Sequence, residues 1–429
     1  MRKVFLILLT VVIVSFYYFP FEFSFLPDLN TKMCLAVVGI FISILSFVQK
    51  KEMLFPQNVA KIGTAAIVVS MIGVVSVVLN NTSDYLYATY FVSMAVWLGG
   101  AYAVCYIIKA VHKTLTIENV TMYITGVCIL QCVMALVINS NVSVKNFIDT
   151  YVIQGQSILD AMDRLYGIGA SLDTAGVRFS ACLIMLTFII AKNKGLMGRW
   201  QNLLSIVAFA ALVVIGNMVA RTTSVGLLLS AMYVLITFRP NHLSKGMLNL
   251  ITSIVVVLLL IVPLCVYLYN NNPQFHQLSR FAFEGFFSLT EKGEWRVGSN
   301  EMLKSMVIFP ENIKTWLIGD GYFLDPYETD PTYVGQYMGG YYMGTDIGYL
   351  RFIFYFGIIG LISFSIFFIL VAKECAYLLP KYKLMILFIL LLGFIIWMKV
   401  STDVFAVFAL LLCVGNMQDE PPQLEEEEV

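Results

Sequence analysis

Charged residues are scarce in this sequence, which limits the kinds of protein that it can encode. Only 13% of the 429 residues are Asp, Glu, Lys or Arg, 59% are hydrophobic, and the formal net charge is 0. A soluble domain cannot bury so large an apolar fraction, because its own surface must still be covered. The neutral total points to no acidic or basic partner, and we predict no nucleic acid among the partners.

Clusters of residues that form disulfides or bind metals are also missing. The eight cysteines lie almost entirely inside apolar stretches, and the segment 270–346 contains none. This distribution excludes a disulfide framework and shows no zinc-ligand spacing. We therefore predict no metal site.

Long apolar runs recur from one end of the chain to the other. A run of about twenty residues crosses a bilayer core of about 30 Å as a helix, and lipid offers the backbone no alternative partner. The sequence predicts an all-α polytopic membrane protein, with residues 1–415 as a single transmembrane domain and residues 416–429 as an acidic disordered cytoplasmic tail. The predicted spans, about twelve in number, are residues 4–19, 33–49, 62–79, 85–108, 120–138, 177–191, 203–219, 223–238, 247–269, 347–372, 384–398 and 404–415.

Basic residues lie in every second connection between these spans. Examples are Lys50 and Lys51 after the second span and Lys109 and Lys113 after the fourth. Because cytoplasmic connections are enriched in Lys and Arg, both termini are predicted to be cytoplasmic. The loops 139–176 and 270–346 are then extracytoplasmic.

Arginines stand out in two of the outward segments. Arg164 and Arg178 frame a glycine-containing stretch, and glycine lets backbone approach a ligand closely. Arg221 lies between two apolar runs, where a cation usually faces a cavity or a partner. Arginine suits phosphate oxygens and keeps its charge at any working pH. The alternatives are a side chain that snorkels to the interface, for Arg178, and a plain hairpin turn, for Arg221.

The large loop 270–346 is rich in aromatic residues. Flat aromatic faces with a polar tip suit sugars, although an interfacial tyrosine belt is the alternative. Asp346 ends the loop at the start of a span, where a carboxylate could act chemically or simply cap the helix. The polar and aromatic candidates of this loop are His276, Arg280, Glu294, Trp295, Arg296, Tyr322, Tyr327, Tyr333, Tyr337, Tyr341 and Tyr342.

The order of these features resembles the O-antigen polymerase and ligase family of bacterial membrane glycosyltransferases, whose fold is that of class C glycosyltransferases. The resemblance covers nearly the whole chain through several short motifs. They are Ala220-Arg221-Thr222, Trp295-Arg296, Trp316-Leu317-Ile318-Gly319-Asp320-Gly321, Asp346-Ile347-Gly348-Tyr349-Leu350 and Phe356-Gly357-Ile358-Ile359-Gly360-Leu361.

The resemblance implies the substrate, the reaction and the location. The substrate would be an oligosaccharide repeat unit on undecaprenyl pyrophosphate, at the outer face of the bacterial inner membrane. The transfer would be inverting and would need no nucleotide sugar, metal or other cofactor. Membrane lipid and a chain-length regulator protein are the further partners to expect.

The resemblance also implies roles for individual residues. Cations must stabilise the departing pyrophosphate, and Arg221 and Arg296 are the first candidates, followed by Arg164, Arg178 and Arg280. A base must accept the proton of the attacking hydroxyl, with Asp346 first and Glu294 and His276 as rivals. The tyrosines of 322–342 and Trp295 would hold the glycan.

Two other functions stay open at this stage. In the ligase branch of the family, a histidine lies near the position of Asp346, and its absence here favours the polymerase branch. A ligase would transfer the glycan to lipid A core instead. A flippase or other transporter usually needs acidic or polar groups in mid-membrane, and the predicted spans contain almost none.

Overall fold

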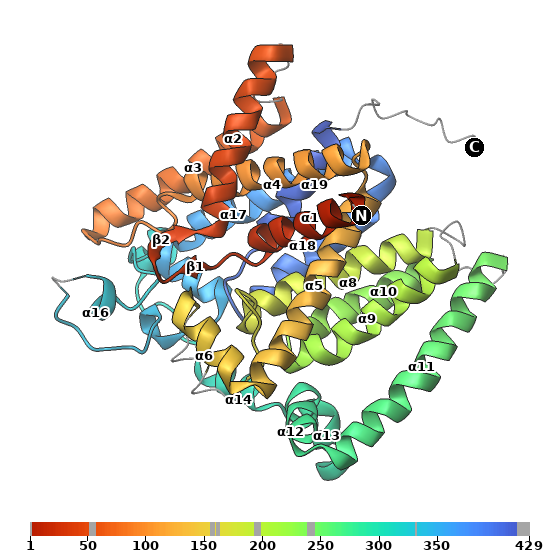
Figure 1. The fold of residues 1–429 in the computed structure, drawn as a ribbon. Coiled ribbons are helices and arrows are strands. Elements are labelled where there is room, and N and C mark those ends of the chain that lie inside the picture. The colour runs from red at the N-terminus through yellow and green to blue at the C-terminus, as the bar shows by residue number, and fades with distance from the viewer. Residues whose placement is uncertain are drawn as a thin grey trace. The chain divides into compact units, whose positions relative to one another are not determined.

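The computed structural model describes residues 2–50, 57–154, 159, 164–192, 199–237, 245–330 and 333–417. Most of the chain is helical, as the ribbon in Figure 1 shows. It forms two compact units, of which the first is Met1–Cys34 with Ile107–Val297 and the second is Leu35–Tyr106 with Gly298–Val429. The single transmembrane domain over 1–415 stays a prediction. From residue 418 onward, the predicted acidic tail lies outside the described residues.

Eight helices within the described residues are long and apolar enough to span a membrane. They are α2 (Thr31–Lys50), α3 (Gln57–Asn80), α4 (Tyr90–His112), α5 (Ile117–Ser140), α8 (Leu172–Lys192), α9 (Arg199–Val219), α11 (Lys245–Asn271) and α17 (Gly348–Leu378). The other four predicted spans are shorter helices, namely α1 (Arg2–Tyr18), α10 (Thr223–Thr237), α18 (Lys383–Ile396) and α19 (Phe405–Met417). The chain is thus an all-α, multi-pass membrane protein, while the count of about twelve spans stays a prediction.

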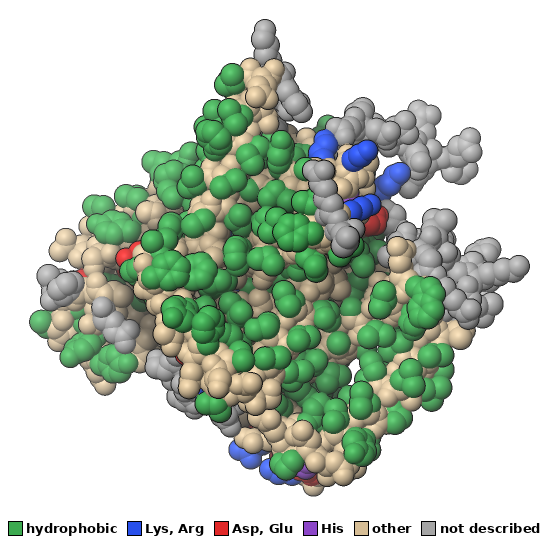
Figure 2. Space-filling model, in the orientation of Figure 1, with side chains coloured by type: hydrophobic (Ala, Val, Ile, Leu, Met, Phe, Trp, Pro, Cys, Tyr) green, Lys and Arg blue, Asp and Glu red, His purple; other side chains and the backbone are tan. Residues whose placement is uncertain are grey.

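The exterior is apolar, as lipid requires. Hydrophobic side chains cover most of the face in Figure 2. On α11, Leu259 is 69% exposed and Leu260 is 68% exposed, and on α2 Val37 is 68% exposed. Apolar patches of this extent are unfavourable in water but match a hydrocarbon environment.

The first unit is built on contacts of α5 with α1, α8 and α9, and of α8 with α10. A small antiparallel sheet has the strand order β2 (Leu26–Asn30), β1 (Glu22–Phe23), β3 (Val152–Ile153), and β3 follows the short helix α6 (Val142–Tyr151). After α11, the short helices α12 (Pro273–Ala282) and α13 (Glu284–Lys292) form a compact pair. The predicted outward loops are therefore partly helical.

The second unit is organised around α17, which contacts α3, α15 (Ile313–Ile318), α18 and α19. The helix is interrupted at Phe356 and Gly357, and Gly357 has a φ of 68°. The interruption leaves backbone carbonyls without helical partners. Asp320 N–H donates to the Phe354 carbonyl at 2.6 Å, and Gly321 N–H donates to the Tyr355 carbonyl at 3.1 Å.

Two of the short family-like motifs therefore pack against each other. A Cβ on Gly357 would lie 2.1 Å from the Leu317 carbonyl oxygen, and one on Gly319 would lie 2.4 Å from the Tyr355 backbone. Both glycines are required by this close contact of two backbones. The predicted loop 270–346 is divided, because its second half belongs to this unit and contains α14 (Gly298–Ser305), α15, α16 (Pro326–Thr329) and the 3₁₀ turn η1 (Tyr342–Gly344). A second 3₁₀ turn, η2 (Pro380–Tyr382), joins α17 to α18.

Candidate anion-binding site

The turn that carries Arg221 is held firmly against α8. A Cβ on Gly176 would overlap the Thr222 hydroxyl at 1.8 Å, and one on Gly226 would lie 2.3 Å from the Ser180 Cα. The Ser180 hydroxyl donates to the Thr222 carbonyl at 2.9 Å and accepts from Gly226 N–H at 3.1 Å. These contacts fix the α9–α10 turn and so the origin of the Arg221 side chain.

The loop that carries Arg164 is held by side-chain amides. The Gln131 side chain accepts from Ile168 N–H at 2.8 Å, and Gln154 accepts from Gly169 N–H at 2.8 Å. A Cβ on Gly167 or Gly169 would collide with Gln131 or with the Phe19 carbonyl. Gly167 and Gly169 thus allow close packing within the protein, and the approach of a ligand to this segment stays a prediction.

Arg221 and Arg164 reach the same aromatic ring. The Arg221 guanidinium carbon lies 4.3 Å from the centroid of Phe281, and the Arg164 guanidinium carbon lies 4.9 Å from it. Arg221 also forms an ion pair with Glu284, the first residue of α13. The structure therefore brings together side chains from three segments that are far apart in the sequence and that the sequence predicts to face outward. We call Arg164, Arg221, Phe281 and Glu284 the arginine cluster.

The arginine cluster contains two guanidinium groups and one carboxylate, and Asp173 acts on Arg164 from nearby. Burial and the nearby charge of Arg221 lower the pKa of the Arg164 guanidinium, and Asp173 acts in the opposite direction. No ion pair involves Arg164 among the described residues, whereas Arg221 has one carboxylate. Two guanidinium groups held this close repel each other, and an anion that contacts both relieves the repulsion. The arrangement is suited to an anion with more than one charged oxygen group.

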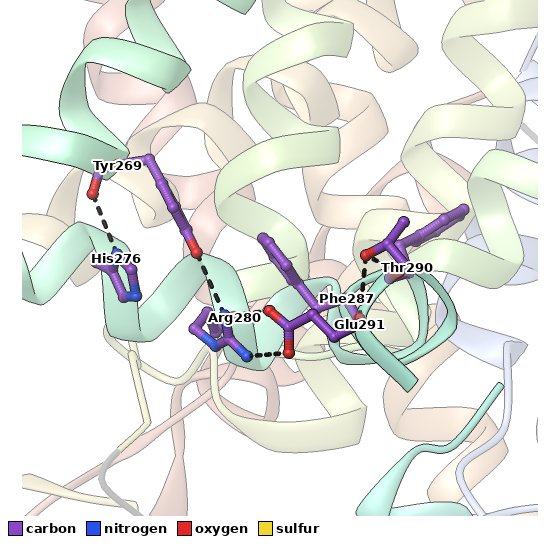
Figure 3. Close-up of polar contacts among 7 residues, drawn as sticks. Tyr269, His276, Arg280, Phe287, Thr290 and Glu291 are labelled. Atoms are coloured by element: carbon purple, nitrogen blue, oxygen red, sulfur yellow. Dashed lines mark hydrogen bonds and ion pairs between the residues drawn. The ribbon is translucent and has the colours of Figure 1, made fainter. Parts of the chain in front are cut away.

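Arg280, another predicted phosphate ligand, is already neutralised. Its two terminal nitrogens each donate to Glu291 at 2.7 Å, and Nη1 also approaches the Tyr269 hydroxyl at 3.4 Å (Figure 3). These hydrogen bonds raise the pKa of Arg280 and lower the pKa of Glu291. The bidentate geometry ties Arg280 to α13, and its role as a phosphate ligand stays a prediction.

His276 lies next to Tyr269, as Figure 3 shows. Its ring stacks on Tyr269 with centroids 4.1 Å apart, and its Nδ1 is 3.2 Å from the Tyr269 carbonyl oxygen. If Nδ1 carries the proton, Nε2 is the acceptor nitrogen. The role of His276 as a base stays a prediction.

The remaining candidates of the first unit are Trp295, Glu294, Arg296 and Arg178. Trp295 packs over Gly285 and edge-on to Phe286, with ring centroids 5.0 Å apart, while Glu294 and Arg296 are exposed. The Arg178 guanidinium lies 5.5 Å from the Phe19 ring. Their predicted roles in binding and catalysis are not tested by these positions.

The tyrosine-rich segment 322–342 belongs to the second unit and is organised by Asp325. This fully buried carboxylate accepts N–H donors from Tyr327 at 3.0 Å, Met338 at 2.6 Å and Gly339 at 2.9 Å. Burial alone raises the pKa of Asp325, but these backbone donors outweigh it, and the pKa lies below its ordinary value. The bridge between Leu324 and Tyr341 closes the segment.

The six predicted glycan-binding tyrosines have different environments. Tyr322 donates to Asp330 at 2.9 Å and Tyr342 donates to Asp320 at 3.2 Å, so both hydroxyls have partners within the fold. Burial, followed by the bond to Asp330, raises the pKa of Tyr322 to about 12. Tyr327 and Tyr337 are 61% and 56% exposed and pack edge-on with centroids 5.7 Å apart. This exposed pair is the part of the segment best able to contact a sugar.

Arg351 is a buried cation that sequence reasoning missed. It lies in the first turn of α17, is 6% exposed, and its guanidinium carbon is 3.7 Å from the Phe323 ring centroid and 3.6 Å from that of Tyr341. It donates to the Ser401 hydroxyl at 2.8 Å. The available signal was one arginine inside a predicted apolar span.

Asp346 directly precedes α17. The N-cap residue of this helix is Ile347, which makes no side-chain cap hydrogen bond. Asp346 is partly buried and interacts electrostatically with Arg351. Its catalytic role and the alternative of a plain helix cap both stay predictions.

Comparison with known proteins finds no relative of this chain. No family model matches the chain, and no curated protein or solved structure matches it either.

Proposed function

We propose that this chain is a membrane glycosyltransferase that polymerises lipid-linked oligosaccharide repeat units. It transfers the growing glycan from undecaprenyl pyrophosphate to the next lipid-linked unit, at the outer face of the bacterial inner membrane. The product is an O-antigen, capsule or exopolysaccharide chain. Both termini then lie in the cytoplasm, and a chain-length regulator is an expected partner.

The observation that supports the proposal most directly is the arginine cluster. Arg164 and Arg221 come from two segments that are predicted to face outward, and both contact the Phe281 ring. A diphosphate has two phosphoryl groups, and arginine fits phosphate oxygens with charge-assisted hydrogen bonds. Such donors also stabilise the charge that grows on the leaving group during transfer.

The reaction assigns a task to each group of residues. The bond between the anomeric carbon and the donor phosphate oxygen breaks, and its electron pair leaves with the diphosphate, which Arg221 and Arg164 stabilise. The acceptor hydroxyl oxygen attacks the anomeric carbon and loses its proton to a base, for which Asp346, Glu294 and His276 are the candidates. The exposed pair Tyr327 and Tyr337 binds glycan in this proposal.

Purified protein incubated with lipid-linked repeat units in detergent tests the proposal. Product longer than the substrate is the expected result, and a transporter gives none, because detergent leaves no compartment. Deletion of the gene should leave single-repeat glycan on gels of surface polysaccharide. Loss of all attached glycan would instead indicate a ligase or flippase and contradict the proposal.

A further inference from the structure

The short helix α13 has its charged and apolar faces reversed with respect to a helix that packs on a protein in water. Its two glutamates, Glu284 and Glu291, lie two turns apart on one face, and each pairs with an arginine of the same unit. Phe286 and Leu289 lie on the opposite face and are 61% and 46% exposed. In water, the acids of such a helix face outward and its large apolar side chains face the protein.

Trp295 extends the exposed apolar face. Its side chain is 55% exposed, and its ring packs edge-on to Phe286 with centroids 5.0 Å apart. The ring lies directly over Gly285, where a Cβ would be 2.5 Å from it. We call Phe286, Leu289 and Trp295 the α13 apolar face. An exposed apolar surface of this kind marks a contact with lipid or with another protein.

The position of α13 along the chain places it at the end of a candidate span. The span α11 ends at Asn271 and α12 begins at Pro273, so a single residue separates them. Tyr269, in the last turn of α11, stacks on Phe287 of α13 with ring centroids 5.6 Å apart and planes at 11°. Since tyrosine is enriched where a span leaves the hydrocarbon, α13 lies at the boundary between membrane and water.

The surroundings of α13 at that boundary favour lipid as its partner. Leu264 and Tyr267, in the last two turns of α11, are 54% and 63% exposed, so the lipid-facing surface of the span continues up to α13. Lys292 ends α13 and is exposed, and an ammonium group at this level can reach lipid phosphates. An apolar face with basic residues beside it is typical of helices that lie in the membrane interface.

We propose that α13 is an interfacial membrane helix, whose apolar face inserts about 5–10 Å into the boundary between lipid head groups and acyl chains. The occupant of this surface is therefore membrane lipid, and Trp295 contacts lipid in place of the glycan expected from the sequence. The inference goes beyond the proposed function and does not depend on it. Because Glu284 on the opposite face pairs with Arg221, the arginine cluster is then held at the level of the lipid head groups.

Nitroxide labels on the α13 apolar face test this arrangement in the purified full-length protein. Phe286→Cys and Leu289→Cys are labelled one at a time, with Cys34→Ser and Cys265→Ser replacing the two native cysteines that are not buried. The protein is placed in vesicles of phosphatidylethanolamine and phosphatidylglycerol. Paramagnetic resonance then compares collisions of the label with oxygen, which concentrates in lipid, and with a water-soluble nickel chelate.

A label at Glu294→Cys is the matched control, because Glu294 is exposed in the turn that follows α13. The ratio of oxygen to nickel collisions at Phe286 and Leu289 should be several-fold higher than at Glu294. Equal ratios at all three positions would place the face in water. Protection of both labels on α13 from oxygen and nickel alike would show that protein covers the face, and either result overturns the proposal.

The fluorescence of Trp295 gives a second measurement that needs no label. Vesicles that contain brominated lipid quench a tryptophan at the interface, and the contribution of Trp295 is the difference between wild type and Trp295→Phe. This difference should be strongly quenched, and a contribution that brominated lipid leaves unchanged contradicts the proposal. Neither measurement uses a substrate. Lipid contact in a protein that extends no lipid-linked repeat unit therefore refutes the polymerase function alone.

Discussion

Charged groups are paired differently in two regions of the molecule. These regions are the arginine cluster of the first unit and the tyrosine-rich segment of the second. In the segment, Asp325 is fully buried and receives three backbone N–H donors, so its charge is satisfied within the fold. In the cluster, Arg164 and Arg221 have one carboxylate between them among the described ion pairs.

This difference separates residues that build a site from residues that act on a ligand. Polar groups that have all their partners within the fold contribute to structure, and replacing them lowers the stability of the protein. Charges that the fold leaves unbalanced are retained at a cost to stability and are candidates for binding. The predictions below test this division, and each pairs a variant with a control from the same kind of environment.

Replacement of Arg221 should have the largest effect on activity. Arg221→Ala removes a cation from the arginine cluster, and loss of one donor to a developing anion costs about 100-fold to 1,000-fold in turnover. Glu284 is 38% exposed and stays hydrated, so the protein should remain folded. The measurement is polymer formation in detergent, together with the amount of protein in membranes.

Arg280→Ala is the control for that experiment. Arg280 also pairs with a glutamate of α13, but it forms a closed bidentate pair with Glu291. Turnover should stay within a few-fold of wild type. Equal losses in both variants would show that paired and unbalanced arginines are not distinguished by function.

Replacement of Gly357 should have the largest effect on stability. Gly357→Ala forces a side chain onto a φ of 68° and places its Cβ 2.1 Å from the Leu317 carbonyl oxygen. The strain and the collision together should lower the free energy of unfolding by about 2–5 kcal/mol. Thermal unfolding in detergent measures the change.

Gly126→Ala provides the contrast, because a Cβ there meets nothing within 4 Å and the residue lies inside α5. Its stability should equal or slightly exceed that of wild type. A Gly357 variant as stable as this control would show that the α15–α17 contact can move aside.

Replacement of Asp325 should destabilise the tyrosine-rich segment and leave the first unit unchanged. Asp325→Asn turns one oxygen into an amide nitrogen that cannot accept the N–H donors, so limited proteolysis between residues 322 and 342 should become several-fold faster. Glu311→Gln, at an exposed acid of the same unit, should leave the rate unchanged.

The pH dependence of the wild-type segment follows from the same carboxylate. The pKa of Asp325 lies below its ordinary value in the folded state. Its contribution to stability is therefore complete above the ordinary aspartate pKa and is lost as pH falls through the lower, folded value. Proteolysis that accelerates already near neutral pH would contradict this assignment.

The apolar helices could be predicted from the sequence because each apolar run carries its own signal. Arg221 could be selected as a candidate too, since no hydrophilic loop surrounds it, and its role in function stays a prediction. Its partner could not, because Glu284 lies 63 positions further along the chain and no local pattern links them. Likewise, the glycines of 316–321 and 356–361 gave a family-like pattern, but their mutual packing depends on the kink of α17.

Which of the six tyrosines are exposed could not be predicted from the sequence either. All six are tyrosines of one segment, yet Tyr342 turns its hydroxyl to Asp320 while Tyr327 stays 61% exposed. Which ring turns outward depends on where Asp325 and the Leu324–Tyr341 bridge fold the chain. Only tertiary contacts distinguish a tyrosine that builds the segment from one that can meet a ligand.

The smallest predicted effect tests this last distinction. Tyr327→Ala removes half of an exposed aromatic pair, so stability should change little, while affinity for a soluble repeat-unit oligosaccharide should fall several-fold. Tyr342→Phe removes only the hydroxyl that donates a hydrogen bond to Asp320. It should therefore lower stability slightly and leave glycan affinity unchanged. Calorimetric titration and thermal unfolding of both variants measure the two effects. If Tyr342→Phe weakened glycan binding as much as Tyr327→Ala, exposure would not be what separates ligand-binding tyrosines from structural ones.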